Sequence, residues 1–124
     1  MRSDRERLRD ILEAIAAIEK YAIQGKEAFE GEELIRTWIA THLQIIGEAS
    51  SSLSQGLKSK YSDIPWNDIV GMRHILVHHY FKMNYKVLWA TVVNDLPPFK
   101  TRVEAMLNEL RSSTPPPSAN TPDA

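Results

Sequence analysis

The sequence contains no cysteine and no long apolar run among its 124 residues. The absence of cysteine excludes a disulfide framework, a Cys-ligated zinc site and thiol chemistry, and it fits a reducing compartment. No apolar stretch approaches the ~20 residues that span a bilayer. The first six residues alternate in charge and lack the apolar core of a signal peptide. We therefore expect a cytoplasmic protein with no membrane association.

Net charge is also nearly absent. Fifteen Lys and Arg residues against sixteen Asp and Glu residues give a net charge of −1, which argues against a polycation that coats nucleic acid. The charges are unevenly placed, because residues 34–103 hold eight basic residues, four acidic residues and all four histidines. This segment could favour a phosphate-bearing partner. It could equally reflect chance in a short chain.

The length and the 43 % of hydrophobic residues suit one packed domain, and their spacing is helical. Ser3 and Glu6 form a capping-box pattern that begins a helix over residues 4–24. A second helix is predicted from Leu34 to near Gly56, and a third from Pro65 to about Phe81. Shorter apolar patterns predict a fourth helix around residues 87–92 and a fifth that begins at Pro98. The sequence thus predicts an all-α, up-and-down bundle of four to five helices.

Four of the seven prolines lie near the carboxyl end, in a stretch without large apolar residues. Such a segment cannot offset the entropy lost on ordering. We expect a helical domain over residues 1–111 and a disordered Pro-rich tail over residues 112–124.

One arginine and three histidines fall within seven positions of the third predicted helix: Arg73, His74, His78 and His79. Histidine titrates near neutral pH and can accept and return a proton. The planar guanidinium of arginine matches the oxygens of a phosphate. Together they are the minimum equipment for cleaving RNA without a metal, since the imidazole can deprotonate a ribose 2′-hydroxyl while the arginine stabilises charge on phosphorus.

Three structural interpretations compete with this chemistry. His74 and His78 stand four apart on one helix, as helical zinc ligands do, although no third ligand is evident. Any single histidine could instead be a packing residue. Arg73 could form a structural ion pair with Asp68 or Glu48. The three tryptophans fit core or interface positions better than base-stacking positions.

Helical geometry places Arg73 and His78 about 140° apart around the axis, so one straight helix cannot direct both at one phosphate. Two copies of the helix that meet across a two-fold axis would solve this by lining one cleft with residues of both subunits. The arrangement predicts a homodimer.

Arg73, four intervening residues and then His78-His79-Tyr80 resemble the R-x4-H-x-Y motif of the HepT toxins in the HEPN superfamily. The polar His74 directly after the arginine also suits that pattern. Further matches lie in the surrounding stretches, namely residues 45–49, 64–66, 71–73, 87–89 and 95–97. The resemblance covers the chain from the first predicted helix to Leu110 and leaves out the tail.

The resemblance implies a HEPN-type bundle that dimerises through its motif helices and acts as the toxin of a toxin–antitoxin pair. It implies that Arg73 and His78 form the ribonuclease pair and that His74, His79 and Glu48 are accessory. It also implies a partner, an MntA-type nucleotidyltransferase, that neutralises the toxin by transferring AMP to Tyr80. The substrate would be RNA, and no metal or other cofactor is expected.

Two alternatives remain open at this level. Tyr80 could simply pack at the dimer interface, as amphipathic aromatic residues often do. The whole protein could be a non-catalytic HEPN module that binds a nucleotidyltransferase and also RNA or a nucleotide.

Overall fold

The computed structural model describes residues 2–78 and 84–113, and these form helices joined by short connections, with no strand among them. The predicted all-α bundle is confirmed. Its long helices are α1 (Asp4–Ala22), α3 (Glu33–Ser51), α5 (Trp66–His78) and α7 (Leu96–Ser113). Helix α6 (Tyr85–Ala90) joins α7 through a π-helical turn, η2 (Thr91–Asp95).

The predicted amino-terminal cap of α1 is confirmed. The Ser3 hydroxyl accepts a hydrogen bond from the Glu6 N–H at 3.1 Å, and the Glu6 carboxylate accepts one from the Ser3 N–H at 2.9 Å. The same hydrogen bonds lower the pKa of Glu6, the backbone N–H of Ser3 having the largest effect. Each carboxylate or hydroxyl at this end satisfies an N–H that has no partner within the helix.

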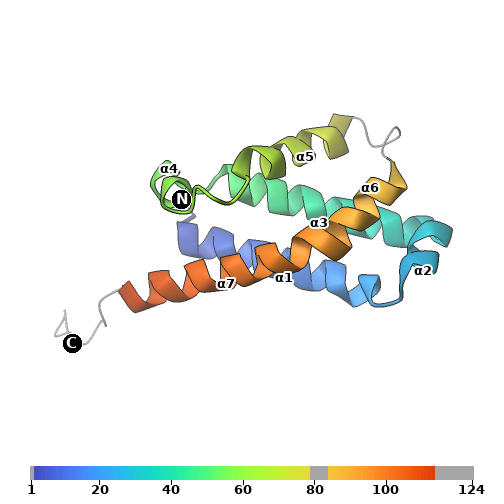
Figure 1. Ribbon diagram of the computed structural model, residues 1–124, viewed down its shortest axis with the longest axis horizontal. Coiled ribbons are helices and arrows are strands. Elements are labelled where there is room, and N and C mark those ends of the chain that lie inside the picture. The colour runs from blue at the N-terminus through green and yellow to red at the C-terminus, as the bar shows by residue number, and fades with distance from the viewer. Residues whose placement is uncertain (1, 79–83, 114–124) are drawn as a thin grey trace.

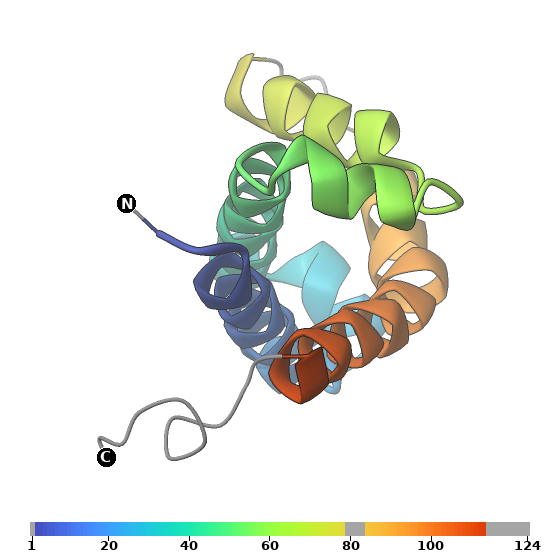
Figure 2. The same ribbon diagram turned by 90° about the vertical axis from the view of Figure 1, so that its left-hand side faces the viewer.

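Helices α1, α3, α5 and α7 lie roughly along one direction, and both the start of α1 and the end of α7 lie at the end of the molecule that carries α4 (Figure 1). The end-on view in Figure 2 shows them arranged around a common interior. The most extensive contacts join α1 to α3, α3 to α5 and α1 to α7. Helix α5 therefore rests mainly on α3 and packs much less against α6 and α7.

Apolar side chains from every long helix meet in the interior. Helix α1 contributes a stripe that repeats every three or four residues, as the sequence predicts, and α3 buries more residues than α1 does. The fully buried large side chains are Leu8, Ile11, Ile15, Ile18, Phe29, Ile39, Leu43, Ile46, Leu76, Leu88, Val103 and Met106.

Two short helices were not predicted from the sequence: α2 (Lys26–Gly31) and α4 (Gln55–Lys60). Each buries a single side chain, Phe29 in α2 and Leu57 in α4. The second predicted helix therefore ends earlier than expected, at Ser51, and the first ends at Ala22. The predicted extension of the third helix to residue 81 lies outside the described residues beyond His78.

The expected break between the fourth and fifth helices is wrong. Residues 85–113 run as one helical rod, with η2 between α6 and α7. Pro97 and Pro98 have no N–H to donate to the carbonyls four residues before them, so the regular hydrogen-bond ladder is interrupted there. The chain accommodates this by widening one turn, in which the Leu96 N–H donates to the Thr91 carbonyl.

Across the described ranges, no helix combines the length and the apolar character required to cross a membrane. Helix α7 ends at Ser113, and the residues after it lie outside the described part of the chain. The division into a domain over residues 1–111 and a disordered tail stays a prediction.

Candidate functional site on helix α5

Helix α5 carries Arg73 and ends at His78, and its first turn is held by hydrogen bonds and by a buried tryptophan. Pro65 precedes it, and the Pro65 carbonyl accepts hydrogen bonds from the N–H groups of Asp68 and Ile69, both at 3.1 Å. The indole N–H of the buried Trp66 donates a hydrogen bond to the Tyr61 carbonyl at 3.1 Å. The Trp66 and Phe99 rings meet edge-on, with their centroids 6.1 Å apart. Trp66 thus closes this end of the bundle, and its burial agrees with the core or interface position expected of the tryptophans.

The loop before α5 is also tied to α7 by polar contacts. Arg102 of α7 makes two hydrogen bonds to the Asp63 carboxylate, at 2.6 and 3.0 Å. Glu109 of α7 accepts a hydrogen bond from the Tyr61 hydroxyl at 2.6 Å and forms an ion pair with Lys60. These contacts lower the pKa of Glu109, chiefly through Lys60, and raise the pKa values of Tyr61 and Lys60, in both cases chiefly through Glu109.

Gly47 of α3 sets how closely α5 approaches. A Cβ atom at position 47 would lie 2.6 Å from the Cβ of Arg73 and 3.2 Å from the Ile69 carbonyl oxygen. Two carbon atoms attract one another best at about 3.5–4 Å, so no other residue fits without displacing α5. Glycine in the middle of a helix costs about 0.5–1 kcal/mol relative to alanine. Glycine at position 47 therefore destabilises α3 locally, but it allows α3 and α5 to pack closely directly beneath Arg73.

Arg73 is anchored by its backbone while its side chain is exposed. Its guanidinium makes no ion pair or hydrogen bond with another described residue, so the alternative of a structural pair with Asp68 or Glu48 is wrong. Glu48 is exposed and follows Gly47 on α3, so it lies near this contact without bonding to the guanidinium. A guanidinium with no carboxylate partner in the described chain keeps its donors for an anion.

Two histidines of the motif, His74 and His78, belong to α5. His74 is exposed on α5, and His78 is its last residue. The side chain of His78, together with His79 and Tyr80, lies outside the described residues. In the ranges 2–78 and 84–113, no three His, Asp or Glu side chains gather closely enough to hold a metal ion. The catalytic, accessory and modification roles expected of these residues stay predictions.

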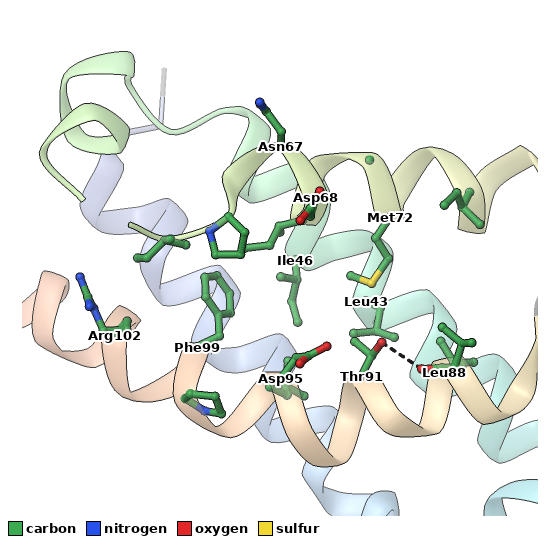
Figure 3. Close-up of a pocket in the computed structure, with 18 of the residues that line it drawn as sticks. Leu43, Ile46, Asn67, Asp68, Met72, Leu88, Thr91, Asp95, Phe99 and Arg102 are labelled. Carbon is green, nitrogen blue, oxygen red and sulfur yellow. Dashed lines mark hydrogen bonds between the residues drawn. The ribbon is translucent and has the colours of Figure 1, made fainter. Parts of the chain in front are cut away.

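A largely apolar cleft of about 800 Å³ opens on the other side of α5, between that helix and α6, η2 and α7 (Figure 3). Leu43 and Ile46 of α3 form its floor. Asp68 stands on the α5 wall and Asp95 on the opposite wall. Neither this cleft nor the role of Gly47 was predicted from the sequence. A glycine between Ile46 and Glu48, within a helical pattern, was nevertheless a visible signal of close packing.

Residues 11–106 match the model of a protein family described as "Ribonuclease HepT-like". The chain belongs to this HepT-like family. The match includes α3, α5 and the whole Arg73 motif, and it confirms the resemblance seen in the sequence.

Two similar proteins come from different organisms. "Probable ribonuclease HepT" from Thermococcus cleftensis is 36 % identical over 106 residues, which cover 85 % of this chain and 96 % of that protein. "Putative RNase TTE0752" from Caldanaerobacter subterraneus subsp. tengcongensis is 33 % identical over 106 residues, or 82 % of this chain and 95 % of that protein. No solved structure gives a significant match.

Proposed function

We propose that this HepT-like protein is an endoribonuclease that cleaves RNA without a metal, using Arg73 and His78 in a cleft between two subunits. The observation that carries the proposal is the state of Arg73. Its backbone is locked against Gly47, its side chain is exposed, and its guanidinium pairs with no described carboxylate. An arginine so placed, on a helix that ends at a histidine, suits the recognition of a phosphate.

The proposed chemistry is transfer of a phosphoryl group within the RNA backbone. The His78 imidazole accepts the proton of a ribose 2′-hydroxyl, and that oxygen attacks the adjacent phosphorus. Arg73 stabilises the negative charge that develops on the phosphate oxygens. The bond to the 5′-oxygen of the next nucleotide breaks, and that oxygen takes up a proton. The products are a 2′,3′-cyclic phosphate and a 5′-hydroxyl end.

A homodimer completes this site. Positions five apart on a regular helix differ by about 140° around the axis, and position 73 is fixed on the side that meets α3. A second copy of the helix can supply the imidazole that the first cannot direct to the same phosphate. His74, His79 and Glu48 are accessory groups in this proposal, which orient the pair or the RNA.

The proposed cellular role is that of a toxin restrained by a nucleotidyltransferase antitoxin of the MntA type. That enzyme would transfer AMP from ATP to the hydroxyl of Tyr80, two residues after His78, with release of pyrophosphate and of the hydroxyl proton. The added phosphate would bring negative charge and bulk next to the cleft, where it would repel an RNA phosphate.

The test is cleavage of a defined RNA by the purified protein in EDTA. We expect cyclic-phosphate ends, and a loss of at least about 100-fold in rate for His78→Ala, the size typical of losing a general base. His42→Ala is the matched control, since His42 lies on α3, where its Nδ1 is 2.7 Å from the Trp38 carbonyl oxygen. Retained cleavage in clean His78→Ala protein would refute the assignment.

The role as a non-catalytic module makes a different prediction. In that case expression alone leaves cells growing normally, no RNA is cut, and Arg73→Ala affects only the binding of the nucleotidyltransferase. Intact-mass measurement and peptide mapping after co-expression with that enzyme would test AMP transfer to Tyr80.

A further inference from the structure

The apolar cleft beside α5 is a second surface, distinct from the Arg73 side of the helix. Its walls are α5 on one side and the rod of α6, η2 and α7 on the other, and its floor is α3 (Figure 3). The α5 wall runs from Pro65 to Ile75, roughly 15 Å at a rise of 1.5 Å per residue. Ile75 and Val87, which line it, are 46 % and 57 % exposed. A groove of this length between two helices matches about three turns of a further helix.

The charges of the cleft are acidic. Arg102 lies at one end and is already paired with Asp63. Asp68 and Asp95 stand on opposite walls, and neither has an ion-pair partner in the described chain. These carboxylates disfavour the phosphates of RNA and favour a cationic occupant.

The π-helical turn is an independent sign that this wall is specialised. Thr91 and Asp95, the first and last residues of η2, both line the cleft. A π turn inserts one extra residue into a helix and rotates the preceding segment relative to the rest, and such turns concentrate at functional sites. Here it allows Val92 of η2 to be buried while Asp95 faces the cleft.

The exposed large apolar side chains of the described chain are spread over several elements and do not single out one of its own helices as the occupant. On α5 and the α6–η2 segment, Ile75 and Val87 line the cleft itself, whereas Val77, Tyr85 and Val93 lie outside it. Ile23 follows the end of α1, and α7 has none. Those on α3, namely Leu34, Trp38 and Ile45, are not accompanied by an exposed Lys or Arg on that helix. Residues 114–124 contain neither a basic residue nor a large apolar one.

We propose that this cleft binds a basic amphipathic helix of a different protein. The apolar stripe of that helix fills the space between α5 and the α6–η2–α7 rod. Lys or Arg residues on its two flanks pair with Asp68 and Asp95. Because the site lies on the helix that carries Arg73, the bound helix would also fix the position of α5 against α7.

The experiment uses the full chain and a labelled synthetic peptide with leucines at helical spacing and lysines on both flanks, followed by fluorescence anisotropy. A second peptide carries glutamate in place of each lysine. We expect only the lysine peptide to bind, and its affinity to fall as salt rises, because exposed charge pairs are screened.

Matched variants locate the site. Asp68→Asn and Asp95→Asn should each weaken the lysine peptide about 2- to 5-fold, the usual size for partly exposed pairs. Ile75→Glu should weaken it at least about 10-fold by placing a solvated charge in the groove. Glu104→Gln on α7 and Val77→Glu on α5 are the controls, since both residues are exposed and neither lines the cleft. They should leave binding unchanged.

Three results would overturn the proposal: equal binding of both peptides, binding that none of the cleft variants alters, and an Asp68→Asn/Asp95→Asn protein that loses an oligomeric state of the wild type in sedimentation. The last result would assign the cleft to a second copy of this chain. No RNA is cleaved in these measurements, so their outcome is independent of the proposed ribonuclease activity.

Discussion

Gly47 lies where α3 packs tightly against α5, so a single methyl group added at this position should displace α5. We expect Gly47→Ala to lower the free energy of unfolding by about 1–2 kcal/mol, because overpacking costs about 1–3 kcal/mol and the better helix propensity of alanine returns less than that. The Cβ atom of an alanine at position 47 would lie only 2.6 Å from the Cβ of Arg73, which causes this overpacking. Urea denaturation followed by circular dichroism measures the change.

Gly71 supplies the control on the facing helix. Nothing in the described chain lies within 4 Å of a Cβ built at position 71. Gly71→Ala should therefore raise the free energy of unfolding by up to about 1 kcal/mol through helix propensity alone. Equal effects of the two substitutions would show that the contact between Gly47 and Arg73 is not a constraint.

These residues also mark what the sequence could reveal about the site. Arg73 and the histidines are visible as a motif, because their chemistry depends on residue type and spacing along one helix. Gly47 and Asp95 lie in stretches that also resemble the family, but their roles could not be inferred from them, since those roles depend on which helices pack together and on the rotation that the π turn introduces. Contacts between helices distant in sequence cannot be obtained from the period of one helix.

At the scale of elements, the tie between α7 and the loop before α5 should make stability depend on pH. The pKa of Glu109 is lowered in the folded chain by Lys60 and then by Tyr61. Because the pKa of Glu109 is lower in the folded than in the unfolded chain, the ionised carboxylate stabilises the fold. This contribution is complete at pH values above the pKa of Glu109 in the unfolded chain, about 4.3, and is lost as the pH falls through its pKa in the folded chain.

Glu109→Gln isolates this effect. We expect the variant to melt at a lower temperature than the wild type at neutral pH, and the difference to vanish as the pH falls below about 4. Thermal melts between pH 7 and pH 3 measure it. Glu104→Gln on the same helix should show no such pH-dependent difference, and a Glu109→Gln difference that persists undiminished in acid would contradict the assigned cause.

The long helices were predictable because each has several apolar residues at regular spacing and an identifiable start, as at Ser3 or Pro65. The short helices α2 and α4 were not, because one buried side chain in six residues defines no period. Pro97 and Pro98 were correctly expected near a helix start. The error was to infer a break from them, since a π turn lets the rod continue.

At the scale of the whole molecule, the proposed dimer site can be tested by mixing two inactive proteins. If Arg73 of one subunit works with His78 of the other, Arg73→Ala and His78→Ala homodimers are both inactive, while a mixed dimer contains one intact pair. Equal mixing by co-expression should restore about a quarter of the wild-type cleavage rate, since half of the dimers are mixed and each has one of two sites.

The same mixture distinguishes a site within one subunit from a shared site. If both residues of a working pair came from the same chain, the mixed dimer would hold no intact pair and no activity would return. The double variant Arg73→Ala/His78→Ala, co-expressed with either single variant, is the matched control, because none of its dimers contains a complete shared pair. Recovery in the first mixture and none in the control would establish that the catalytic unit is the pair of subunits, which is the arrangement that the rotation between positions 73 and 78 requires.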